Sequence, residues 1–239
     1  MNDLEKILIG FGEFQIDYQD FLQKLSKIKA ILFDWDGVFN TGIKIDQTGS
    51  PFSEVDSMGI NLMRFGFWLK NEQMPVCGII TGESNHVAFY LAQREHFQSV
   101  YYRFKNKLQA FNHFLQQQNL ESDQVAFVYD DVLDLSIAQE CGLGFLVRRA
   151  ASPLLQDYIK ANGLCDYITT NSSHDHAVRE ICELILGAMG MFTKVVEERI
   201  AFSELYISYL SERQTITPYF FTLKDNQIVQ NTPSSKVGF

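Results

Sequence analysis

Short apolar runs alternate with longer amphipathic stretches over most of this 239-residue chain. The apolar runs are too short for helices and lack a polar side, which indicates strands buried on both faces of a parallel sheet. We expect strands at 29–34, 75–81, 99–102, 125–129, 143–147 and 167–168, with helices between them. This alternation predicts an α/β fold built on a doubly wound, mostly parallel sheet.

Three further segments are expected around this sheet. Residues 1–28 read as a mostly helical lead-in whose apolar side docks on a core spanning 29–190. Alternating residues from Ile43 to Val55, with a turn at Asp46–Gly49, predict a small β-hairpin flap. Residues 191–239 are expected to form a helix at 192–210 and an aromatic-rich tail with a turn at 224–227, serving as an oligomer or lid element.

Polar side chains follow several of the expected strands. The first strand ends in Asp34 and Asp36, and residues i and i+2 of an extended chain lie on the same side. Two such acids repel each other unless a cation or a shared proton intervenes. They suit Mg2+, a carboxylate nucleophile and a neighbouring general acid, although an ordinary turn is the alternative reading of D-x-D-G.

The carboxyl ends of parallel strands meet at one edge of a sheet. The second strand ends in Thr81, and a later helix opens with Lys107. The strand at 125–129 is followed by a group of acids, Asp130, Asp131 and Asp134. Together with the first acidic pair, these residues predict a phosphoryl-transfer site at that edge.

Composition narrows the choice of partner. The formal net charge is −9 and no long basic run occurs, which disfavours nucleic acid and anionic membrane surfaces. The four cysteines form no C-x-x-C and are expected to be buried free thiols. The first residues lack a secretion-signal pattern and no apolar run reaches membrane-spanning length, so a soluble, cytoplasmic protein is expected.

Four short motifs carry a resemblance to a known family. They are F-D-W-D-G-V (33–38), I-I-T-G (79–82), N-K-L (106–108) and V-Y-D-D-V-L-D (128–134). The set resembles the haloacid dehalogenase superfamily of phosphatases. More narrowly, the chain is similar over about 29–186 to the phosphatases of 3-deoxy-D-manno-octulosonate 8-phosphate and acylneuraminate 9-phosphate.

The resemblance implies roles for the strand-end residues. Asp34 would be the nucleophile that forms an aspartyl-phosphate, and Asp36 the general acid and then base. Thr81 would bind a phosphoryl oxygen, and Lys107 would neutralise the developing charge.

The same resemblance implies a Mg2+ site formed by Asp34, Asp130 and the backbone carbonyl of Asp36. Asp131 or Asp134 would hold a metal-bound water or Lys107, with a solvated helix-start acid as the alternative for Asp134.

Substrate contacts are expected from residues near these motifs: Gly82, Glu83, Asp56, Ser57 and Arg64. A glutamate after T-G resembles the branch that acts on nine-carbon sugars. A substrate carboxylate would then need another cation, and Arg64, Arg148 and Arg149 are candidates, with plain surface charge as the alternative.

No cap domain is expected, because the intervals from Asp34 to Thr81 and from Thr81 to Lys107 are already filled by predicted elements. The flap and the C-terminal tail would have to close the site. The resemblance implies a homotetramer whose tails reach a neighbouring subunit. Tyr219–Phe221 is the candidate interface segment, unless the tail folds on its own core.

Two departures from the family pattern bear on specificity. Tyr129 replaces a glycine before the paired acids and would add a hydroxyl near the metal. Residues 173–176, S-H-D-H, replace a glycine-rich loop and suit either a second metal site or a helix cap at Ser173 or Asp175 with two exposed imidazoles.

These observations predict a Mg2+-dependent, capless phosphomonoesterase acting on a phosphorylated acidic sugar. The same chemistry on another small sugar phosphate is one alternative. A non-catalytic protein of this fold that binds a sugar phosphate or a protein partner is the other.

Overall fold

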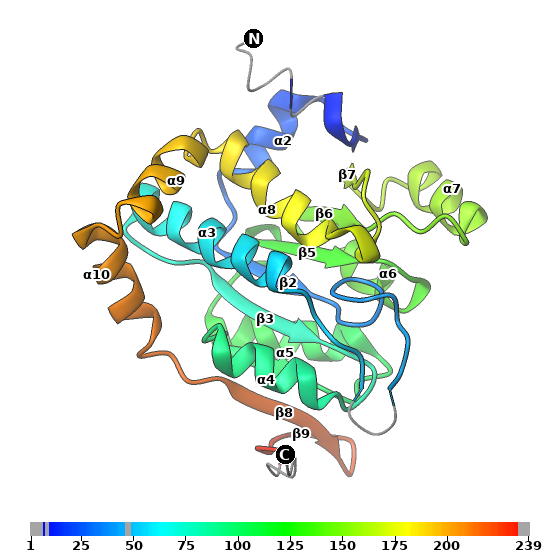
Figure 1. The fold of residues 1–239 in the computed structure, drawn as a ribbon. Helices are drawn as coiled ribbons and strands as arrows, with labels where there is room; N and C mark the ends of the chain where they lie inside the picture. Colours follow the sequence, from blue (N-terminus) through cyan, green and yellow to red (C-terminus); the bar gives the residue numbers. More distant parts are fainter. Residues whose placement is uncertain (1–6, 8–9, 46–48, 234–239) are drawn as a thin grey trace.

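A computed structural model describes residues 7, 10–45 and 49–233. Their strands form a single sheet in the order β1-β7-β6-β5-β2-β3-β4-β8-β9 (Figure 1). The short β1 (Glu13–Phe14) pairs antiparallel with β7, and β9 (Gln227–Gln230) pairs antiparallel with β8. All pairs between β7 and β8 are parallel, which confirms the predicted doubly wound, mostly parallel sheet.

The six strands expected from the apolar runs are all present. They are β2 (Ala30–Phe33), β3 (Val76–Ile80), β4 (Ser99–Tyr101), β5 (Val125–Tyr129), β6 (Leu143–Leu146) and β7 (Tyr167–Ile168). Side chains of β2 alternate between two cores: Ile31 and Phe33 enter one, Ala30 and Leu32 the other. A strand buried on both faces therefore reads as an uninterrupted apolar run.

Helices cover both faces of the sheet. The first core is closed by α2 (Tyr18–Leu25), α3 (Glu54–Asn71), α4 (His86–Arg94) and α8 (Ala177–Ala188). The second is closed by α5 (Lys107–Gln118), α6 (Leu135–Ala138) and α7 (Pro153–Ala161). Phe21 and Leu25 of α2 are buried, so this helix of the lead-in docks on the core. No cap domain interrupts the described part of the chain.

The expected flap differs from a paired hairpin. Ile45 and Gly49 form one isolated bridge, and the predicted turn falls largely on residues 46–48, outside the described residues. The expected returning strand is wrong, because Ser53 accepts a hydrogen bond from the Val55 amide and α3 begins at Glu54. A serine in this position satisfies a free amide of the first helical turn, which outweighs the short apolar alternation.

The C-terminal segment is part of the same sheet. The single helix expected at 192–210 is two helices, α9 (Phe192–Ile200) and α10 (Glu204–Arg213), separated where Phe202 has a φ of 47°. The chain then forms β8 (Tyr219–Lys224), parallel to β4, and turns through Asp225 and Asn226 into β9. Both turn residues have positive φ, as a two-residue hairpin requires.

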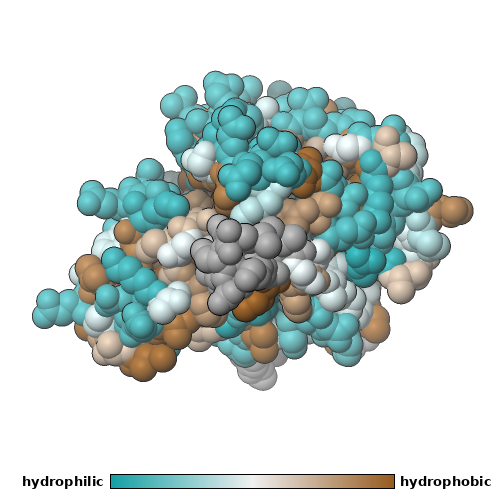
Figure 2. All heavy atoms as spheres, turned by 90° about the horizontal axis from the view of Figure 1, so that it is seen from above, coloured by the Kyte–Doolittle hydropathy of each residue, from teal (hydrophilic) through white to brown (hydrophobic). Residues whose placement is uncertain are grey.

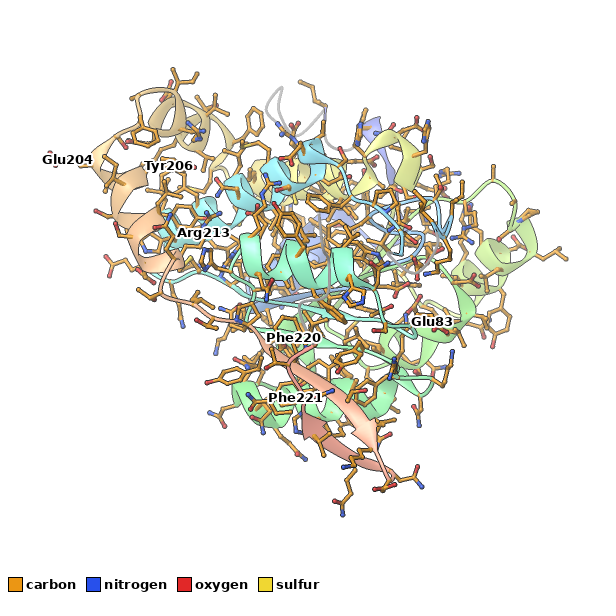
Figure 3. All side chains as sticks on the ribbon, turned by 60° about the horizontal axis from the view of Figure 1, so that its bottom comes forward. Glu83, Glu204, Tyr206, Arg213, Phe220 and Phe221 are labelled. Carbon is orange, nitrogen blue, oxygen red and sulfur yellow. The ribbon has the colours of Figure 1, made fainter. Side chains whose placement is uncertain are left out.

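This arrangement decides between the two readings of the aromatic tail. Phe220 and Phe221 are buried within the protein's own cores, and Figure 3 shows them on β8. Only Tyr219 of the proposed interface segment is exposed. The tail therefore folds on its own core, and the homotetramer stays a prediction from resemblance alone.

One face of the molecule is mainly hydrophilic. Seen from above, polar residues cover most of the face over α2, α8 and α7, with apolar areas scattered between them (Figure 2). In the described part of the chain, no helix combines the length and the hydropathy needed to cross a membrane.

Candidate active site

The predicted catalytic residues converge where the sheet reverses its winding direction. β2 lies between β3 and β5, and Asp34 follows β2 while Asp130 follows the adjacent β5. The Asp34 amide donates to the Val128 carbonyl, which fixes its position against β5. A crevice forms at such a switch point because the following segments leave in opposite directions.

A buried ion cluster lies at this point. The Lys107 ammonium, at the first residue of α5, lies 2.6 Å from Oδ1 of Asp34 and 2.5 Å from Oδ1 of Asp134. The Asp131 amide donates to the other oxygen of Asp134. Of the two roles expected for Asp134, the structure therefore favours holding Lys107, and the solvated-acid alternative is wrong because the side chain is buried.

The pKa values of two carboxylates at this point, Asp34 and Asp130, are raised. Burial raises the pKa of Asp34 to about 7, with repulsion from Asp134 adding to the shift and Lys107 opposing it. Burial and the Asp34 charge raise the pKa of Asp130 to about 8, against the effect of Arg149. Although burial opposes it, the two carboxylates beside Lys107 raise the pKa of its ammonium. Burial, with repulsion between the carboxylates added to it, therefore disfavours their charged forms, and a bound cation would offset that cost.

The residues fit a hard divalent cation. Carboxylate oxygens of Asp34, Asp130 and Asp134 lie within 4.8 Å of one another. Oδ1 of Asp130 is buried and, among the described residues, has no hydrogen-bond partner. Lys107 occupies only Oδ1 of Asp34, so Asp34 and Asp130 each offer an oxygen to Mg2+, which prefers oxygen ligands.

Asp131 is not part of this oxygen cluster. Its side chain is half-exposed, accepts a hydrogen bond from the Val132 amide and lies 3.6 Å from Arg149. It caps the short 3-10 helix at Val132–Asp134. The metal role suggested for Asp131 thus receives no support from its position, whereas that of Asp130 does.

Asp36 lies at the open side of the cluster. Ser50 donates to its Oδ1 at 2.6 Å, and Lys44 forms an ion pair with its Oδ2. Gly37, with a φ of 90°, turns the chain immediately afterwards. Sequence reasoning missed Lys44 and Ser50, because a pattern along the chain does not show which loop residue folds back onto Asp36.

Thr81, Gly82 and Glu83 follow β3 at the same edge. Oγ1 of the buried Thr81 accepts a hydrogen bond from the Glu83 amide, which leaves its hydroxyl hydrogen available for a ligand. Glu83 is exposed and pairs with Lys105 at 2.6 Å, and this hydrogen bond lowers the pKa of its carboxyl. The structure therefore brings these three predicted residues to the rim of the site.

Three of the expected substrate contacts are internal instead. Arg64 is completely buried and donates to the carbonyls of Glu95 and His96, so its candidacy as a substrate cation is wrong. Ser57 is buried and donates to Glu95. Asp56 is buried and accepts the Arg179 amide at the start of α8. All three lie on α3, which begins at Glu54 and turns their side chains inward.

The two family departures also have structural explanations. Tyr129 stacks on Phe127 in the second core and donates to the Leu164 carbonyl, so its hydroxyl does not face the metal ligands. His176 lies 3.6 Å from Asp56, while Ser172 and Asp175 hydrogen-bond to each other. No second group of three potential metal ligands occurs among residues 7, 10–45 and 49–233. Asp56, rather than Ser173 or Asp175, supplies the acceptor at the start of α8.

The two remaining arginines face different ways. Arg148 donates to the Thr169 carbonyl and pairs with Glu13, which ties β1 to the sheet. Arg149 pairs with Asp130 and is the one arginine of the three candidates that reaches the site. The two arginines are adjacent in the sequence but have different partners in the structure. The sequence alone therefore could not show which of them reaches the site.

Comparison with known proteins places this geometry in a family context. No protein-family model matches the chain. Over 174 residues it is 28% identical to 3-deoxy-D-manno-octulosonate 8-phosphate phosphatase of Escherichia coli, a match that covers 72% of this chain and 86% of that protein. The corresponding enzyme of Yersinia pestis is 28% identical over 172 residues, covering 71% and 85% of the two chains.

Solved structures agree with these relatives. A subfamily III A hydrolase of the haloacid dehalogenase superfamily from Legionella pneumophila is 28% identical, with a TM-score of 0.62 over 81% of this chain and 95% of its own. The 3-deoxy-D-manno-octulosonate 8-phosphate phosphatase of Moraxella catarrhalis is 27% identical, with a TM-score of 0.63 over 75% and 97%. That protein was solved in complex with a magnesium ion, a phosphate ion and a KDO molecule.

Proposed function

Because this chain belongs to the capless branch, subfamily III A, of the haloacid dehalogenase superfamily of phosphatases, we propose that it hydrolyses a phosphorylated acidic sugar with Mg2+ as cofactor. The observation that carries the proposal is the buried Asp34–Lys107–Asp134 cluster beside the unpartnered oxygen of Asp130. A carboxylate nucleophile, a fixed cation and an unpartnered carboxylate oxygen then meet at one edge of the sheet, where β2 and β5 end.

Each residue of the cluster has a distinct task. Oδ2 of Asp34 attacks phosphorus and forms an aspartyl-phosphate, while Lys107 holds the other oxygen and neutralises charge on the transferring group. Thr81 donates its hydroxyl hydrogen to a phosphoryl oxygen. Asp134 orients Lys107 without taking part in bond making.

Asp36 provides the acid and base steps. As an acid it protonates the leaving sugar oxygen, and as a carboxylate it then takes a proton from the water that cleaves the aspartyl-phosphate. The hydrogen bond from Ser50 and the ion pair with Lys44 fix the position of the Asp36 carboxylate. Mg2+ held by Asp34, Asp130 and the Asp36 carbonyl would add Lewis-acid polarisation of the phosphoryl oxygens.

The substrate proposal is an octulosonate 8-phosphate, the compound for which the relatives are named, or a nonulosonate 9-phosphate. The exposed pair Glu83–Lys105 and the half-exposed Lys44 offer hydroxyl and carboxylate contacts at the rim. Another small sugar phosphate would use the same chemistry with fewer rim contacts.

The test is phosphate release with and without Mg2+ from octulosonate 8-phosphate, two nonulosonate 9-phosphates, a hexose 6-phosphate and an aryl phosphate. The Asp34→Asn protein serves as the blank. A strong Mg2+-dependent preference for one acidic sugar supports the proposal in full. Activity on the aryl ester alone keeps the mechanism and refutes the substrate, and silence throughout refutes the enzyme and favours a binding protein.

A further inference from the structure

Arg149 reaches the end of β5 from the neighbouring strand. It follows β6, whose Leu146 pairs with Tyr129, and its guanidinium forms an ion pair with Oδ2 of Asp130. The same group lies 3.6 Å from Asp131. A Cβ at Gly37 would stand 2.1 Å from Oδ2 of Asp130 and 2.3 Å from the Arg149 guanidinium. The glycine at this turn therefore makes room for the pair.

The two oxygens of Asp130 have different surroundings. Oδ2 is occupied by Arg149, whereas Oδ1 is buried without a partner. Asp34 and Asp134 already share the buried Lys107. Arg149 is thus the only counter-charge that contacts Asp130 in the described part of the chain.

The two cations differ in freedom. The Lys107 side chain is 3% exposed and contacts the carboxylates of Asp34 and Asp134. Moving Lys107 away would leave both carboxylates buried without a counter-charge, which is costly. The Arg149 side chain is 35% exposed, so its guanidinium can turn into solvent without losing hydration of its own charge. Lys107 is a fixed counter-ion and Arg149 a replaceable one.

We propose that Arg149 competes with Mg2+ for Asp130, holding the carboxylate in the metal-free protein and giving way when the ion binds. The inference rests on the proposed metal role of Asp130. Mg2+ on Oδ1 of Asp130 would stand beside the guanidinium on Oδ2, and two cations on one carboxylate repel each other, so tight binding of the ion requires the ion pair to open. Apparent affinity then falls by the fraction of molecules in which the pair is open.

The test compares Mg2+ binding by isothermal calorimetry to the wild-type protein and to Arg149→Met. If the pair is open in roughly a tenth of the molecules, the variant binds Mg2+ about tenfold more tightly. The Mg2+-induced rise of the thermal unfolding midpoint grows accordingly. Arg149→Lys keeps a positive charge beside Asp130 and should stay closer to wild type than Arg149→Met does.

Arg148→Met is the matched control. It removes the same charge from the adjacent position, and the Arg148 side chain is 36% exposed, but its contacts are with Glu13 and Thr169. Equal tightening in both variants would show a general charge effect and overturn the proposal. Unchanged or weaker binding by Arg149→Met would overturn it too, and would make Arg149 a support for the ligand.

Failure of the proposed function gives a different result. Asp130→Asn should abolish Mg2+ binding whether or not Arg149 competes. If neither wild type nor Arg149→Met binds Mg2+, the metal site and the inference are both refuted. If wild type binds and Arg149→Met binds no better, the metal site stands and the inference alone is refuted.

Discussion

Two buried charged clusters lie at opposite ends of this molecule and differ in how their carboxylates are satisfied. At the strand ends, Oδ1 of Asp130 has no donor and the pKa values of Asp34 and Asp130 are raised to about 7 and about 8. At the other end, Glu95 is buried and each of its carboxylate oxygens has a donor, Ser57 to one and Arg213 to the other. Figure 3 shows Arg213 and Tyr206 on the side of the molecule away from Glu83, which marks the rim of the site.

The Glu95 cluster joins helices to one another, whereas the cluster at the strand ends leaves a carboxylate oxygen free to bind a ligand. Glu95 connects α3, α4 and α10, because its backbone carbonyl also accepts Arg64 of α3. Tyr206 and Tyr209 add bonds from α10 to Asn61. A buried carboxylate with a donor on both oxygens holds structure together, whereas one with a buried oxygen left without a donor carries a free-energy cost that a cation can remove.

The largest effect is expected at the strand ends, where a substitution of Asp34 should abolish catalysis and leave stability nearly unchanged. Asp34→Asn should lower kcat by at least about 10⁴-fold, since it removes the nucleophile. The unfolding midpoint should stay within about 5 °C of wild type, because Lys107 keeps Asp134 as a partner. Phosphate release and thermal unfolding measure the two. Activity near that of wild type would sink the nucleophile assignment.

The opposite pattern is expected at Glu95. Glu95→Ala leaves Arg213 unpaired in a largely buried position. The loss should be about 3–5 kcal/mol of unfolding free energy, or roughly 10 °C in the midpoint, with kcat of the folded protein unchanged. Glu54→Ala is the control, because Glu54 pairs with Arg94 on the surface and its loss should barely move the midpoint. Equal effects of the two variants would contradict a structural role for the Glu95 cluster.

The raised pKa values predict a pH dependence of the metal-free protein. Folded Asp34 and Asp130 bind protons up to about pH 7 and about pH 8, whereas their ordinary value is 3.8. The folded state therefore binds more protons than the unfolded state between these limits, so unfolding free energy falls as pH rises across the window.

Thermal unfolding in a chelator from pH 4 to 8 measures this fall. The Asp130→Asn protein should show a smaller fall than wild type, and saturating Mg2+ should flatten it in wild type only. Identical pH profiles for the two proteins would show that Asp130 does not titrate in this range.

The smallest effect concerns the rim. Glu83→Gln frees Lys105 from an exposed ion pair, so an anionic substrate gains a cation. KM for an acidic sugar phosphate should fall roughly two- to fivefold, with kcat and stability unchanged. Lys105→Gln should do the reverse. If both variants leave KM as it is, the rim pair takes no part in substrate binding.

The sequence by itself determined which residues form the strands and which polar groups stand at their ends. Apolar runs such as 30–33 and 125–129 have no polar side, and only a doubly covered parallel strand buries them fully. Because parallel strands deliver their ends to one edge, Asp34, Thr81, Lys107 and Asp130 could be placed together before any distance was known.

Tertiary structure alone decided which polar side chains face inward and which residues outside the strand ends meet. Arg213 meets Glu95 across 118 residues, a separation at which no local pattern carries information. The expected substrate roles of Arg64, Asp56 and Ser57 failed because helix start and packing set where a side chain points. The tail joined its own sheet because β4 offered an open edge, and Arg149 reached Asp130 because Gly37 left it room.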